Sequence, residues 1–205
     1  MKKANLLVLG LVVAMGLSSC IKEGDTFDPQ AQYELEKPEI EAYAEANLVN
    51  PQFDEETGIW YEITSMGDPT SFEYKAVLSQ SDNRYYPEAP DVWVNYTGKL
   101  LNGTVFDTKD EAAGVKMSFN NIIQGWIYVF FPEKILVDKD GDPLEKPLDF
   151  VGFTSSGLKK GAKVRFVVPS YLAYGNAANG KIPANSPLDF EIEVINIASP
   201  SGTGN

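Results

Sequence analysis

Residues 92–108, with the sequence VWVNYTGKLLNGTVFDT, decide the fold. Val92, Val94 and Tyr96 fall on one side of an alternating pattern, which predicts a β-strand with one buried face. The Asn-Gly pair at 102–103 lies between apolar segments, and such a pair is a strong signal for a tight hairpin turn. The stretch therefore predicts two antiparallel strands that are neighbours in a sheet.

The same alternation recurs in the C-terminal half of the chain. Apolar residues take every second position over 164–168 and again over 188–194, where the residues between them are acidic. Strands of this kind have one buried and one solvated face, as in antiparallel sheets. The chain also has 13 Pro and 17 Gly, which indicate many turns. The pattern predicts an antiparallel sheet with little helix, one face of which must be covered.

The chain starts with the features of an export signal. Lys2 and Lys3 precede an apolar run at 4–17, which is too short to span a bilayer and is typical of a secretory signal. The run ends in Leu-Ser-Ser-Cys at 17–20. This ending resembles a bacterial lipobox, in which the Cys is acylated and becomes the first mature residue. The alternative is a signal peptide that ends in a chance Cys.

The lipobox reading predicts a location as well as a modification. We expect a lipoprotein signal peptide at 1–19 and a lipid on Cys20, the only Cys of the chain. The lipid would anchor the protein to a membrane of the cell envelope. We expect this to be the outer membrane, on its periplasmic or its surface face.

Composition excludes several classes of function. The 205 residues include no His, which removes Ser-His-Asp catalysis and His metal sites. Once Cys20 is acylated, no thiol remains for redox or nucleophilic chemistry. The formal net charge of −12 repels nucleic acid, so no nucleic-acid partner is expected.

An acidic run at 138–142, DKDGD, is similar to the start of a calcium-binding EF-hand loop. Such a loop needs Gly at its sixth position. This chain has Pro143 there, and Gly141 falls at the fourth position. We therefore expect a tight acidic turn and no metal site.

Six short blocks resemble, in the same order, those of the FKBP-type peptidyl-prolyl cis-trans isomerases. They are VNYTGKL at 94–100, NGTVFDT at 102–108, IIQGW at 122–126, LKKGAKV at 158–164, LAYG at 172–175 and IPANSPLDFE at 182–191. Each block alone is a weak signal, but the ordered set is specific. The resemblance covers 58–197.

The resemblance implies the organisation of the chain. It places an isomerase domain at 51–198, between a lipidated tether with a short N-terminal helix at 20–50 and a C-terminal tail at 199–205. Residues 21–30 are expected to form the tether, and the apolar spacing predicts the helix at 31–47. Pro38 would have to lie in the first turn of that helix.

The fold that the resemblance implies is α+β: a strongly curved antiparallel sheet wrapped on one short helix. The active site of the family is an apolar cavity between helix and sheet. By matching blocks, Asp107 and Tyr174 take the catalytic positions, and Trp126 forms the floor on which the Pro ring sits. The remaining substrate-binding positions are Tyr96, Phe106, Ile122, Ile123, Ile182 and Phe190.

The implied chemistry suits these residue types. Rotation about an X-Pro bond is slow because it breaks amide resonance. The twisted amide is less polar than the planar one, so a dry aromatic cavity favours it. The family holds substrate carbonyls with the backbone N–H at Ile123 and the hydroxyl at Tyr174. No proton moves, so no cofactor is expected, and the partners are proline-containing polypeptide segments.

Two insertions depart from the family pattern. The path from Trp126 to Gly161 is much longer than in the family, and a second insertion lies near 72–86. The β-branched and aromatic run at 127–132 ends in Pro and predicts a strand or a fixed loop. The covering helix is then expected to be displaced to around 148–158 or replaced. We expect 127–157 to form a flap that limits which substrates enter the cavity.

Two functions of different class follow. The first is a membrane-tethered isomerase that assists the folding of exported proteins, favoured by Tyr96, Asp107, Trp126 and Tyr174. The second is a catalytically weak or inactive FKBP-fold binding module, or a chaperone in a cell-envelope assembly, favoured by the insertion at 127–157.

Overall fold

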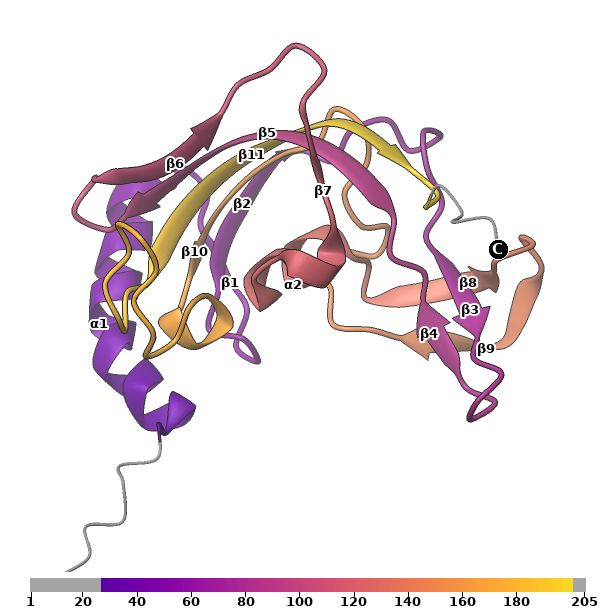
Figure 1. The fold of residues 1–205 in the computed structure, drawn as a ribbon, viewed down its shortest axis with the longest axis horizontal. Helices are drawn as coiled ribbons and strands as arrows, with labels where there is room; N and C mark the ends of the chain where they lie inside the picture. The colour runs from indigo at the N-terminus through magenta and orange to yellow at the C-terminus, as the bar shows by residue number, and fades with distance from the viewer. Residues whose placement is uncertain (1–26, 201–205) are drawn as a thin grey trace, which may run out of the picture.

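The structure is a computed structural model that describes residues 27–200. In spatial order, the main sheet contains β1 (Gln52–Phe53), β2 (Trp60–Ser65), β10 (Lys163–Val168), β11 (Leu188–Ala198), β5 (Asp91–Leu100) and β6 (Val105–Lys109), with β7 (Val115–Met117) also paired to β5. All of these pairs are antiparallel. The sheet arches over a short helix, α2 (Gln124–Phe130) (Figure 1). The predicted α+β class with a curved antiparallel sheet is confirmed.

The hairpin predicted at 92–108 is formed by β5 and β6. Gly103 has a φ of 86°, a left-handed conformation that glycine adopts without steric cost. The N–H of Gly103 donates to the carbonyl of Leu100 at 2.8 Å, and the N–H of Leu100 donates to the carbonyl of Thr104 at 3.0 Å. The predicted turn at the Asn-Gly pair is therefore confirmed.

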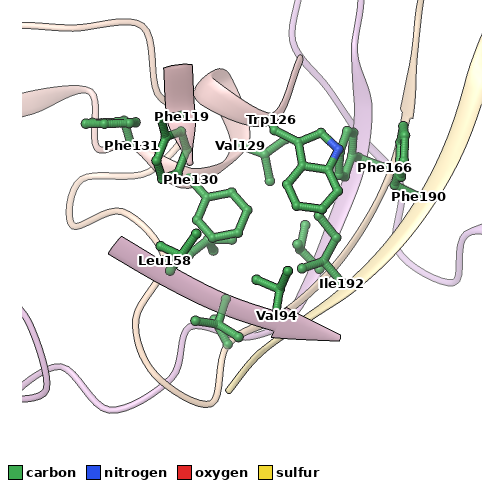
Figure 2. Close-up of a cluster of buried hydrophobic side chains, with 14 of the residues drawn as sticks. Val94, Phe119, Trp126, Val129, Phe130, Phe131, Leu158, Phe166, Phe190 and Ile192 are labelled. Atoms are coloured by element: carbon green, nitrogen blue, oxygen red, sulfur yellow. The ribbon is translucent and has the colours of Figure 1, made fainter. Parts of the chain in front are cut away.

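Helix α2 lies where the sequence predicted a strand or a loop, so that prediction is wrong. Trp126, Val129 and Phe130 follow a helical spacing, and all three are at most 2% exposed. Figure 2 shows them among the side chains of the sheet. Burying such side chains gains about 1.5–3 kcal/mol each, which exceeds the weak helix preference of β-branched residues. The helix ends before Pro132.

Helix α1 (Pro29–Asn47) packs on the outer face of the main sheet, opposite α2. Side chains alternate along β10, so Phe166 points into the main core and Val167 points outward. Val167 packs there against Ile40, Ala44 and Leu48. The helix begins two residues earlier than predicted and overlaps the expected tether at 29–30. Among the described residues, no helix is long and apolar enough to cross a membrane.

The start of α1 explains why the prediction for Pro38 is wrong. Asp28 caps the helix by accepting hydrogen bonds from the N–H groups of Gln30 and Ala31, and Pro29 occupies the first helical turn. A proline is tolerated there because its missing N–H would have no helical partner. Pro38 therefore lies inside the helix rather than at its start.

The two insertions pair with each other in a second sheet. Its order is β4 (Tyr85–Pro87), β3 (Lys75–Leu78), β8 (Lys134–Asp138) and β9 (Pro143–Asp149). The β3–β8 pair is parallel, which differs from the expected purely antiparallel arrangement. No helix is formed at 148–158, so the predicted displaced helix is wrong. The second sheet lies to one side of the arch (Figure 1).

The acidic run joins β8 to β9 as a tight turn, as predicted. The side chain of Asp138 accepts hydrogen bonds from the N–H groups of Asp140 (2.9 Å) and Asp142 (3.0 Å). Within the described residues, no group of three or more His, Cys, Asp or Glu side chains is arranged to hold a metal ion.

Candidate active site

A cavity of about 350 Å³ opens between α2, the β5–β6 hairpin and the loop after β10. Aromatic rings form its base. The ring of Trp126 meets that of Tyr96 edge to face at 5.4 Å between centroids, and meets Phe190 in the same way at 5.5 Å. Trp126 is 2% exposed. The full lining is Tyr96, Phe106, Asp107, Met117, Asn121, Ile122, Ile123, Gln124, Trp126, Ala173, Tyr174 and Phe190.

The β5–β6 hairpin positions one wall of this cavity. Tyr96 lies on β5, and Phe106 and Asp107 lie on β6, with Gly98 paired to Asp107. A Cβ at Gly98 would lie 2.4 Å from the ring of Phe106. The Thr-Gly of the first sequence block therefore leaves the space that this ring occupies, and Phe106 in turn packs edge to face on Phe190 at 5.6 Å.

The polar groups of the cavity are arranged around Asp107. The hydroxyl of Tyr96 donates a hydrogen bond to its carboxylate. Burial raises the pKa of Tyr96, and the hydrogen bond to Asp107 raises it further. Burial and then the charge of Asp107 also raise the pKa of Tyr174. Both phenols therefore remain protonated at neutral pH, and both line the cavity.

Short helical segments position the remaining lining. Ile123 is the cap residue of α2, with extended backbone (φ −64°, ψ 148°), and its carbonyl accepts from the N–H of Trp126 at 3.2 Å. Tyr174 follows η2 (Ser170–Leu172), the 3-10 turn after β10. A second 3-10 turn, η1 (Phe119–Asn121), precedes Ile122. Helix and loop thus face each other across the cavity.

The structure brings together every residue predicted for the site except Ile182. Ile182 belongs to the hydrophobic core and is not among the lining residues, and its part in substrate binding stays a prediction. The catalytic roles assigned to Asp107 and Tyr174 stay predictions. Cys20, the predicted lipid site, lies outside the described residues.

Sequence reasoning missed four lining residues. Gln124 and Ala173 lie inside the quoted blocks IIQGW and LAYG, so the blocks carried a signal for them. Met117 ends β7 and Asn121 ends η1. Neither lies in a block, and only the path of the chain between β7 and α2 brings them to the cavity.

The insertion does not form a flap over this cavity. None of the lining residues comes from 127–157. The β8–β9 hairpin extends from the other end of α2 and joins the second sheet (Figure 1). The prediction that this segment forms a flap at the cavity and limits substrate entry is therefore wrong.

A curved antiparallel sheet with a helix under its arch and an aromatic cavity between them defines a class of α+β binding folds. A family model described as FKBP-type peptidyl-prolyl cis-trans isomerase matches residues 153–195. The chain is 30% identical over 151 residues to the FKBP-type peptidyl-prolyl cis-trans isomerase FkpA of Aeromonas hydrophila, covering 73% of this chain and 41% of that protein. The chain therefore belongs to the FKBP-type peptidyl-prolyl cis-trans isomerase family.

Two further proteins are similar to the chain. A probable FKBP-type peptidyl-prolyl cis-trans isomerase of Haemophilus influenzae is 30% identical over 144 residues, covering 69% of this chain and 44% of that protein. A crystal structure of a peptidyl-prolyl cis-trans isomerase from Pseudomonas syringae pv. tomato aligns with a TM-score of 0.49 and 22% identity, covering 86% of this chain and all of that one. The chain spans less than half the length of the two curated relatives.

Proposed function

We propose that the protein is a peptidyl-prolyl cis-trans isomerase that assists the folding of exported proteins. The observation that carries the proposal is the cavity in which Tyr96 and Phe190 stand edge to face on Trp126, with Asp107 and Tyr174 among its polar groups. A Pro ring on the Trp126 floor brings its preceding amide against the aromatic walls. The walls favour the less polar, twisted amide over the planar one.

The chemistry needs only a modest fraction of the rotational barrier. An acceleration of about 10⁴-fold corresponds to about 5.5 kcal/mol out of a barrier of about 18–20 kcal/mol. Binding of the twisted state and a hydrogen bond from Tyr174 act on the same step. Apart from Asp107 the lining is uncharged, so we expect a preference for an apolar residue before Pro.

The test is a protease-coupled isomerisation assay on the purified chain, with peptides that vary in the residue before Pro. The expected result is a rate above background that is highest for apolar residues. The same assay separates the second candidate function. A folded protein that binds an X-Pro peptide but leaves the rate at background is a binding module, and the isomerase proposal then fails.

We also propose that the protein is anchored to the cell envelope through lipid on Cys20. The proposal is supported by the apolar run at 4–17 and the Leu-Ser-Ser-Cys that follows it. In detergent phase partitioning of expressing cells, the wild-type protein is expected in the detergent phase. Cys20→Ala is expected either in the aqueous phase or as an unprocessed precursor that keeps residues 1–19 and migrates as a larger protein. Equal partitioning of two proteins of the same processed size would contradict the anchor. Proline-containing segments are the proposed partners, and the net charge of −12 disfavours nucleic acid.

A further inference from the structure

The loop that presents Tyr174 is built around one buried residue, Ser170. Its carbonyl accepts a hydrogen bond from the N–H of Ala173 at 2.9 Å and another from the N–H of Gly175 at 2.8 Å. These are the two residues on either side of Tyr174. Ser170 is 0% exposed. The position of the Tyr174 hydroxyl in the cavity therefore depends on where Ser170 is held.

Ser170 is held by a carboxylate from the N-terminal helix. One oxygen of Glu36 accepts the N–H of Ser170 at 2.8 Å, and the other accepts its hydroxyl. The second oxygen also accepts the side-chain amide of Gln32 at 2.7 Å. Glu36 is 4% exposed. A buried carboxylate is expensive unless its oxygens are hydrogen-bonded, and here its partners include both polar donors of Ser170.

Helix α1 is itself fastened to the sheet further along its length. The hydroxyl of Tyr43 donates to Asp189 at 2.9 Å, and Asp189 also accepts two hydrogen bonds from Arg165, at 3.0 and 2.8 Å. A third guanidinium hydrogen bond reaches the carbonyl of Asn47 at 2.7 Å. Hydrogen bonds to charged groups are stronger than neutral ones. Glu36 is thus carried on a helix whose C-terminal end is tied to β10 and β11.

We propose that Glu36 is a positioning residue for the isomerase site, acting through Ser170 on the loop that carries Tyr174. The inference rests on the proposed function, because Tyr174 is the hydroxyl expected to hold the substrate carbonyl. It gives α1, which lies outside the residues matched by the family model, a part in the site. The helix supports the cavity from the outer face of the sheet, without contributing a lining residue.

The first experiment is a double-mutant cycle between Glu36→Gln and Tyr174→Phe, measured as kcat/KM for an X-Pro peptide. The side-chain amide of Gln accepts only through its oxygen because its nitrogen is a donor. Glu36→Gln therefore cannot keep all three hydrogen bonds that the carboxylate accepts from Ser170 and Gln32. We expect a loss of about three- to tenfold in the wild-type background, the size of one hydrogen bond. In the Tyr174→Phe background we expect a further loss below about twofold, because coupled residues are not additive. Full multiplication of the two losses would overturn the proposal.

The controls separate positioning from general stability. Glu39→Gln makes the same charge change at an exposed site on the same helix and is expected to leave kcat/KM unchanged. If Glu36→Gln does not fold, Ser170→Ala removes only the hydroxyl contact and is expected to give a smaller loss with the same dependence on Tyr174. An equal loss in Glu39→Gln would overturn the assignment.

A second readout does not depend on activity. Amide hydrogen exchange measured by NMR reports on the N–H groups of Ala173 and Gly175, which bond to Ser170. We expect both to exchange faster in Glu36→Gln than in the wild type, while amides in the middle of β11 keep their rates. If the wild-type protein is inactive, the proposed function fails and this measurement still tests the clamp. Unchanged exchange at both amides would overturn the role of Glu36.

Discussion

Aromatic residues lie beside both the main sheet and the second sheet, but only those under the main sheet line the cavity of the candidate active site. Under the main sheet, Trp126 offers its ring to Tyr96 and Phe190 edge to face, and the three line a cavity. Beside the second sheet, Phe131 packs on Tyr74 at 5.3 Å and on Phe150 at 5.0 Å. Aromatic content alone therefore does not make a binding site; what matters is whether faces and polar edges are left accessible.

Their tyrosines show the difference most clearly. The hydroxyl of Tyr74 shares its one proton between the carbonyls of Phe130 (2.8 Å) and Leu158 (2.9 Å), and the residue is 4% exposed. It joins the insertion to the helix, and its hydroxyl is engaged by these two carbonyls. Tyr174 lines the cavity, where its proposed role is to donate to a substrate carbonyl. We infer that the second sheet stabilises the fold, whereas the proposed isomerase site lies under the main sheet.

The strongest test of this division is Trp126→Ala. The ring is 2% exposed and also stacks on Phe130 at 5.8 Å, so we expect a loss of about 3–5 kcal/mol in the free energy of unfolding, together with loss of isomerase activity. Leu136→Ala, at a second-sheet side chain that is 59% exposed, is the control and should change stability by less than about 0.5 kcal/mol. Urea unfolding measures both. A small effect at Trp126 would mean that the floor is not packed as described.

Ile135→Ala tests whether the second sheet contributes to stability alone or also to activity. Ile135 is 1% exposed in the shared core, and we expect its truncation to cost about 2–5 kcal/mol of stability. At a temperature where the variant is fully folded, kcat/KM should equal that of the wild type. A fall in kcat/KM of the folded variant would break the division, and the aromatic contacts from Phe131 through Phe119 to Phe130 would be the route.

Alkaline pH should weaken the contribution of Tyr74. Burial raises its folded-state pKa above the ordinary value of 10. The contribution is therefore complete below about pH 10 and is lost as pH rises further, because the unfolded state releases its proton first. Between pH 10 and 11 the loss approaches about 1.4 kcal/mol per pH unit. Urea unfolding from pH 8 to 11 measures it.

Tyr74→Phe is the matched control for that titration. It removes the phenol while keeping the ring, and it leaves Lys159, whose Nζ lies 5.1 Å from the ring centroid and whose pKa is lowered by burial, in both proteins. The stability of the variant should fall less steeply above pH 10. Parallel curves for the two proteins would show that Tyr74 is not the group that titrates.

The smallest expected effect is at Tyr174. Tyr174→Phe removes one hydrogen bond worth about 0.5–1.5 kcal/mol, so kcat/KM should fall by about two- to tenfold. The free energy of unfolding should hardly change, since the side chain is only partly buried. This is the reverse of the result expected for Ile135→Ala. Unchanged kcat/KM would show that Tyr174 has no part in the mechanism. The proposed difference between Tyr174 and Tyr74 would then be lost.

Local signals were enough to predict much of the main sheet. Alternation identified β5, β10 and β11, and the Asn-Gly pair identified the β5–β6 turn, because each depends on neighbours in the chain. The resemblance identified eight of the lining residues, and Ile182, which it also predicted, is not among them. Helix α2 was missed because its apolar run has no helical preference of its own, and burial of Trp126, Val129 and Phe130 decides its conformation.

The sequence by itself determined the family, the curved sheet and most of the cavity lining, since these follow from short blocks in a set order. Only the tertiary structure decided the contacts between distant segments. The pairing of β3 with β8 joins two insertions about which the sequence had no common signal. The bond from Glu36 to Ser170 spans 134 positions. The hydrogen-bond partners of a buried carboxylate come from segments that only the tertiary fold brings next to it. A local sequence pattern therefore does not predict them.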